Sequence, residues 1–352
     1  MKNVTYPVII CFALLAATGS SRQMPWLTED YEKAITRGAD AMVTLLIKDE
    51  QGDAVPNATV TVGSLPAKAR TYKREKYLSG ETGEVVVKAV STEQIGAYIE
   101  KVGYYSTSFQ FVAGDPPGLH DYGGETSKIY YDSLVKDGRW LPWNPTIPVV
   151  LREVRNPVPL YATWVDECLL PNDVDVGFDC EKGDFIKPLG RGVVADFTIR
   201  VSSVGIVFKN ATSTILLSAV EDGGGFLRRR KIKSSAFISE YEAPIEGYDR
   251  TVQTPDDVQA DEYLFFKSRI VRNEEGNIVS ANYGKLYGEV EYGPGKNPDW
   301  KSGEPLKSVD YGWVRFSYYF NPTPNDRNLE FDKKKNLFGE KDHKTLSTIQ
   351  TP

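Results

Sequence analysis

The sequence of 352 residues is poor in histidine, cysteine and methionine, with 2, 3 and 3 residues of each type. A Ser-His-Asp triad or a histidine-rich zinc site needs histidines that converge in the fold, so two histidines argue against both. An excess of basic residues is also lacking, because 42 Lys and Arg stand against 48 Asp and Glu. Nucleic-acid binding needs a concentrated basic face, so the composition gives no electrostatic basis for such a partner.

Long apolar runs are lacking after the first twenty or so positions, so we expect no transmembrane segment once a signal is removed. The first positions combine Lys2, an apolar run at Val8–Ala17 and small residues up to Ser20. This pattern is typical of a secretory signal peptide, here over residues 1–21. Retention as an uncleaved anchor is the alternative. The expected location is the periplasm, the cell surface or the extracellular medium.

Helical periodicity is scarce, whereas Tyr (20), Phe (15), Gly (30) and Pro (21) are plentiful. Aromatic residues suit pleated surfaces and Gly and Pro suit turns, so the composition predicts an all-β protein. Thr28 could cap a short lead-in helix, with a loosely held arm as the alternative. The proline-rich stretch Leu141–Ala162 reads as the end of one β domain and the start of another. We expect a lead-in helix or arm at residues 22–38 and a first β-sandwich at 39–153. A second β-rich domain would follow at 154–332, and a polar tail at 333–352.

The first domain carries a recognisable series of residues on alternating strands and turns. They are Asp49, Gly52, Val55, Pro56, Asn57, Ala58, Val60, Val62, Thr82, Gly83, Lys101, Gly103 and Tyr104. This layout resembles that of carboxypeptidase regulatory-like domains, which are transthyretin-like β-sandwiches of secreted proteins. The resemblance implies the fold and says little about activity. The insert Ala113–Trp140, with His120, is longer than in that family and reads as a binding loop or a surface elaboration.

The second domain resembles an uncharacterised family of exported bacterial proteins that carry the same domain in front. The resemblance rests on PWNPTIPVVLREVRNPVPLYA, GDFIKPLGRGVVADF, EEGNIVSANYGKLYGEVEY and VRFSYYFNPTPNDRNLEFD. It implies no activity. Alternating apolar runs over this half predict a second antiparallel, sandwich-like domain.

Two groups of residues in the second domain are candidate ligand-binding sites. Trp313 and Tyr319 share one face of an alternating run, and an aromatic platform there would bind sugar rings. Packing of that face under a neighbouring loop is the alternative. Arg228 and Arg230 follow three glycines and share a strand face, which indicates either a polyanion site or a charged hairpin edge.

The acidic loop at 166–184 offers two further predictions. A solvated acidic loop is the default interpretation, but Asp173, Asp175 and Asp179 alternate as calcium ligands do; no other cofactor is indicated. Cys168 and Cys180 would form a disulfide in an oxidising compartment, with two separate thiols as the alternative.

These features together predict an exported, non-catalytic protein with a binding or structural role. Its partner would be a glycan or a cell-surface protein. The alternative is a carboxylate-based glycan hydrolase, whose acid pair no sequence spacing can identify because such carboxylates meet only in the fold.

Overall fold

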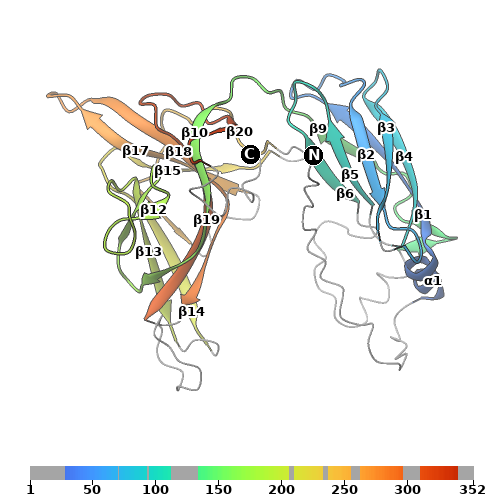
Figure 1. The fold of residues 1–352 in the computed structure, drawn as a ribbon, viewed down its shortest axis with the longest axis horizontal. Helices are drawn as coiled ribbons and strands as arrows, with labels where there is room; N and C mark the ends of the chain where they lie inside the picture. Colours follow the sequence, from blue (N-terminus) through green and yellow to red (C-terminus); the bar gives the residue numbers. More distant parts are fainter. Residues whose placement is uncertain are drawn as a thin grey trace.

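The computed structural model describes residues 28–69, 71–92, 95–111, 134–205, 210–232, 237–254, 262–295 and 310–339. The expected signal peptide, His120 and most of the expected tail lie outside these ranges. Within them the chain is all-β, as predicted, with one helix and two β-sandwich lobes (Figure 1). None of the described segments forms a helix with the length and apolar character that crossing a bilayer requires.

The first lobe packs two sheets against each other. One sheet contains β4 (Glu84–Ser91), β1 (Ala39–Lys48), β8 (Arg139–Trp140) and β7 (Val135–Lys136), with β9 (Thr146–Val150) paired in parallel to β1. The other contains β3 (Lys73–Leu78), β2 (Thr59–Ser64), β5 (Ile95–Glu100) and β6 (Thr107–Phe111). Alternate residues of β1 are buried in the shared core, as period-two patterning requires: Ala41, Val43, Leu45 and Ile47.

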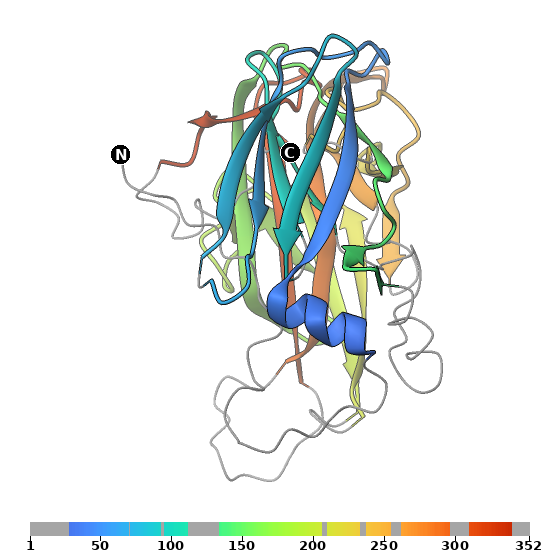
Figure 2. The ribbon, with the colours of Figure 1, turned by 90° about the vertical axis from the view of Figure 1, so that its right-hand side faces the viewer.

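Local sequence fixes the ends of these elements. Helix α1 (Glu29–Arg37) begins after Thr28, whose hydroxyl accepts a hydrogen bond from the Tyr31 amide at 3.2 Å. The helix lies across the lower end of the sandwich (Figure 2), where Tyr31 meets the Trp140 ring edge-on at 6.0 Å. Gly83 has a φ of +75°, and a Cβ there would lie 2.2 Å from the Ile47 carbonyl oxygen, so the turn before β4 requires glycine.

The second lobe packs a six-stranded sheet against a five-stranded sheet. The larger sheet contains β15 (Gly225–Arg230), β17 (Glu262–Arg272), β18 (Ile278–Gly295), β19 (Tyr311–Asn321), β10 (Val158–Pro171) and β20 (Phe331–Asn336). The smaller contains β12 (Asp184–Phe185), β11 (Val176–Asp179), β13 (Phe197–Val204), β14 (Thr212–Ala219) and β16 (Thr251–Thr254). β20 extends into the segment that the sequence assigns to a polar tail, and Phe338 beyond it is also buried.

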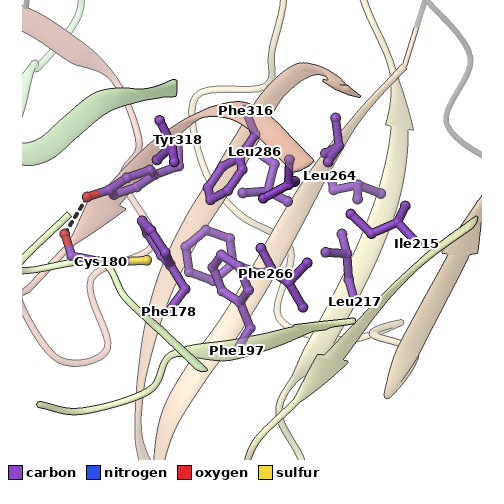
Figure 3. Close-up of a cluster of buried hydrophobic side chains, with 14 of the residues drawn as sticks. Phe178, Cys180, Phe197, Ile215, Leu217, Leu264, Phe266, Leu286, Phe316 and Tyr318 are labelled. Carbon is purple, nitrogen blue, oxygen red and sulfur yellow. Dashed lines mark hydrogen bonds between the residues drawn. The ribbon is translucent and has the colours of Figure 1, made fainter. Parts of the chain in front are cut away.

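Aromatic rings fill the space between these two sheets (Figure 3). Phe178 lies at their centre, 5.6 Å from Phe197 and 5.1 Å from Phe316, measured between ring centroids. Even-numbered residues of β19 enter this core, among them Val314, Phe316, Tyr318 and Phe320. The opposite face of the six-stranded sheet is covered along part of its length by a further core, which includes Tyr263, Phe265, Tyr319, Leu329 and Phe331.

The two lobes meet around the buried side chain of Arg152, which is 3% exposed. Its Nε lies 2.7 Å from Glu50 Oε1 of the first lobe, and its Nη1 donates to the main-chain carbonyls of Phe237 (3.0 Å) and Ser239 of the second. The guanidinium also lies over the rings of Phe237 and Tyr241, at 4.7 Å and 4.3 Å. One cation therefore bonds to both lobes, and we call this region the junction.

Two further buried charges complete the junction. Glu330 accepts hydrogen bonds from the Tyr105 hydroxyl (2.9 Å) and from the amides of Arg155 (2.7 Å) and Asn156 (2.6 Å). Lys285, fully buried, donates to Ser239 Oγ at 2.7 Å and to the Leu329 carbonyl at 3.0 Å. Burial and the nearby Arg152 charge hold the pKa of Lys285 well below its usual range. Both ionisable groups thus have polar partners although their side chains are buried.

We expect Arg152→Met to destabilise the protein by about 3–5 kcal/mol, because it leaves the Glu50 carboxylate and two carbonyls without their partner. Urea unfolding followed by tryptophan fluorescence measures this free energy. Arg74→Met, at an exposed arginine of β3, is the matched control and should change stability by less than about 0.5 kcal/mol. Equal effects of the two substitutions would show that the junction does not hold the lobes together.

Candidate functional site

Two tryptophans and an arginine share the uncovered part of the outer face of the six-stranded sheet. The Arg315 guanidinium lies 5.5 Å from the Trp164 ring centroid and 5.7 Å from that of Trp313. It also pairs with Glu167 at 3.0 Å and Glu291 at 3.1 Å. These five residues form what we call the Trp313 surface.

The strand register explains how these side chains come together. Glu291 and Gly293 of β18 lie opposite Arg315 and Trp313 of β19. A Cβ at Gly293 would lie 2.7 Å from the Trp313 Nε1, so glycine is needed for the indole to lie across the neighbouring strand. A hollow of about 400 Å³ adjoins the indole, and Tyr292 and Ser213 are among the residues that line it.

The electrostatics of the Trp313 surface favour uncharged ligands. Glu167 and Glu291 form ion pairs with Arg315 and neutralise its charge. A third carboxylate, Asp166, lies 3.8 Å from the Arg315 Nε. An anion would have to displace these carboxylates. A polyol can instead accept from Arg315 and donate to Glu291 while its apolar face stacks on an indole.

Tyr319, which the sequence places beside Trp313 in an aromatic platform, is in fact 1% exposed. It does share the outer face with Trp313, but that end of the sheet is covered. Phe331 packs edge-on against Tyr319 at 5.0 Å, and the Lys285 ammonium lies 5.0 Å from the Tyr319 ring. For Tyr319 the structure therefore agrees with the alternative, in which a neighbouring segment covers the face, and Trp164 is the second aromatic of the surface.

Arg228 and Arg230 lie on β15, away from the residues of the Trp313 surface in the strand order. Arg228 lies 3.6 Å from Glu262 on the adjacent strand β17, while Arg230 is exposed. Between them, Arg229 pairs with Glu240 at 3.3 Å. Acidic neighbours offset part of the basic run, which weakens the case for a polyanion site and fits a charged hairpin.

The three aspartates of the predicted calcium loop bond to other groups of the chain. Asp175 is in an ion pair with Arg200, with the Arg200 Nε 2.9 Å from Oδ1. Asp179 is buried, and its two oxygens accept hydrogen bonds from the main-chain amides of Glu181, Lys182, Val193 and Val194. In the part of the chain that the structure describes, no three His, Cys, Asp or Glu residues are grouped as metal ligands. Asp173, Asp175 and Asp179 therefore stabilise the conformation of the loop through bonds to its own chain.

The sequence did not reveal a buried carboxylate cluster around Arg269. Asp196 Oδ1 lies 2.8 Å from the Arg269 Nε, Glu181 pairs with Nη1, and Asp179 lies 3.6 Å from Nη2. Asp196 also accepts from the Ser268 hydroxyl and the Cys180 amide. Burial raises the pKa of Asp196, although Arg269 opposes this. The acids face a cation of their own chain, not one another, so this arrangement serves stability more readily than glycoside hydrolysis.

We expect Arg269→Met to destabilise the protein by about 3–5 kcal/mol, since it leaves Asp196 charged, buried and unpaired. Adding Asp196→Asn should recover part of the loss, because the amide keeps the acceptor without the charge. Urea unfolding of the two single variants and the double variant measures the coupling. Strictly additive losses would mean that the two side chains do not act as a pair.

The predicted disulfide between Cys168 and Cys180 is absent, and both residues are free thiols. Cys168 lies on β10 of one sheet, and Cys180 directly follows β11 of the facing sheet. Both thiols contribute to the aromatic core instead. Burial raises the pKa of Cys168 to about 11 and that of Cys180 well above its usual range.

Since only a thiolate reacts, iodoacetamide should label Cys168 slowly at pH 8, about tenfold faster at pH 9 and faster still at pH 10. Cys180, fully buried, should label only after unfolding in guanidinium chloride. Peptide mapping by mass spectrometry distinguishes these two sites from Cys11. A peptide pair linked through Cys168 and Cys180 would contradict the free-thiol state.

No protein-family model and no curated protein matches the sequence. Several solved structures show a weak likeness. The 3-chlorocatechol 1,2-dioxygenase of Rhodococcus opacus 1CP is 11% identical with a TM-score of 0.25, covering 36% of this chain and 63% of that one. The catechol 1,2-dioxygenase of Acinetobacter sp. ADP1 is 14% identical with a TM-score of 0.24, covering 34% and 54%. The chain thus spans less than two thirds of either enzyme, and a likeness at these TM-scores carries no conclusion about activity.

Proposed function

We propose that this protein is an exported, non-catalytic binding protein whose second lobe binds a neutral sugar ring on the Trp313 surface. The observation that carries the proposal is the arrangement of Trp164 and Trp313 around an arginine that carboxylates already neutralise. Rigid aromatic faces supply contact area at low entropic cost. The adjoining hollow offers polar groups for sugar hydroxyls, among them Ser213 and Glu291.

Export rests on the signal-like pattern of residues 1–21, and the first lobe fits the same proposal. Its residue series resembles carboxypeptidase regulatory-like domains, which commonly accompany secreted proteins. On this proposal the first lobe is such a domain, and it presents the second lobe through the junction. The hydrolase alternative would need two carboxylates free to act on a glycosidic bond. The buried acids around Arg269 are bonded to that arginine, so binding without turnover is preferred.

We expect Trp313→Ala to weaken binding of a neutral glycan about tenfold or more, because it removes the stacking face. A glycan array on the purified full chain would identify the sugar, and isothermal titration calorimetry would measure the dissociation constants. Tyr98→Ala, which removes an exposed aromatic ring from β5 of the other lobe, is the control and should leave this affinity unchanged.

Three outcomes would contradict the proposal. The wild-type chain could bind no neutral glycan on the array. Trp313→Ala could bind as tightly as the wild type. The bound glycan could be cleaved on prolonged incubation, as shown by new reducing ends, which would favour the hydrolase instead.

A further inference from the structure

A second groove, on the first lobe, differs in charge from the Trp313 surface. It has a volume of about 610 Å³, and its lining includes Asp40, Lys73, Glu75, Lys88, Arg139 and Trp143. It runs from the sheet of β4, β1 and β8 to the edge strand β3 of the other sheet. The strand register sets Asp40 opposite Arg139, in the parallel pairing of β1 with β8.

The groove carries a local excess of positive charge. Lys73 and Glu75 pair with each other at 2.7 Å, which leaves Lys88 and Arg139 against the single carboxylate of Asp40. Neither Lys88 nor Arg139 forms an ion pair with any residue that the structure describes. The chain as a whole has a formal net charge of −6, so the groove is opposite in sign to the protein's net charge. An anion would therefore be attracted here.

An exposed aromatic ring lies beside these cations. Trp143 is 36% exposed, and the Arg139 guanidinium lies 4.9 Å from its ring centroid. The next residue, Asn144, fixes this loop to β1: its amide donates to the Met42 carbonyl at 2.9 Å, and its Oδ1 accepts from the Thr44 hydroxyl at 2.8 Å. The backbone that carries Trp143 is thus held in place, which lowers the entropic cost of binding.

We propose that this groove binds a carboxylated sugar, such as a uronic acid residue of an acidic polysaccharide. The sugar ring stacks on Trp143, and the carboxylate accepts hydrogen bonds from Arg139 with Lys88 close by. An arginine can hold a carboxylate through two parallel hydrogen bonds, which a neutral ring does not reproduce. The site is independent of the Trp313 surface, where the arginine is already neutralised.

Calorimetry with galacturonic acid oligomers and with their methyl esters tests this proposal on the full chain carrying Trp313→Ala, because the neutral ester could otherwise bind at the Trp313 surface. The ester keeps the ring and removes the charge, so the acid form should bind at least tenfold more tightly. Arg139→Gln should weaken binding of the acid form about tenfold and Lys88→Gln about threefold, and Trp143→Ala should weaken both forms. Because these side chains lie at the surface, circular dichroism should show unchanged folding.

Two control variants separate this proposal from the proposed function. Arg74→Gln removes an exposed charge outside the groove and should leave the affinity unchanged. Trp313→Ala should also leave it unchanged, whatever its effect on neutral glycans. Absence of binding by the wild type, equal binding of acid and ester, or full retention of affinity in Arg139→Gln would overturn the proposal. Equal competition by single-stranded DNA would overturn it too, by showing a general polyanion surface.

Discussion

The arrangement of the two lobes depends on one buried guanidinium. Removing a charge from water is costly, and Arg152 offsets that cost only because Glu50, two main-chain carbonyls and two aromatic rings surround it. The carbonyls and rings belong to the second lobe, whereas Arg152 and Glu50 belong to the first. Neither lobe alone supplies all the partners of this cation, so the packing of each lobe depends on the other.

The junction also determines which part of the six-stranded sheet is accessible to a ligand. The segments that supply Ser239 and Glu330 to the junction continue into Ala243, Leu329 and Phe331, which cover one end of the outer sheet face. Tyr319 is buried beneath them, while Trp313, further along β19, is not. The proposed sugar-binding surface is therefore the part of that sheet face that is still exposed when the two lobes are packed together.

Period-two patterning made much of the fold predictable. The alternation in β19 predicts that one face of the strand enters a core, and Val314, Phe316, Tyr318 and Phe320 form that face. The same pattern left the exposure of Tyr319 open, since it cannot show whether a distant segment covers the second face. Arg152, within a charged run after a proline-containing strand, reads as a solvated side chain. Its burial depends on residues about 85 positions later, which no local pattern contains.

Distance along the chain also has a consequence for the order of folding. The strands of the first lobe are complete by Val150, yet the carbonyl partners of Arg152 lie at Phe237 and Ser239, and the carboxylate that holds Tyr105 is Glu330. During synthesis the leading half thus emerges while the Arg152 side chain, which is buried in the final fold, is still hydrated. The first lobe reaches its final packing only after nearly the entire polypeptide has been synthesised. A truncated product would therefore expose the unpaired junction residues to chaperones and proteases.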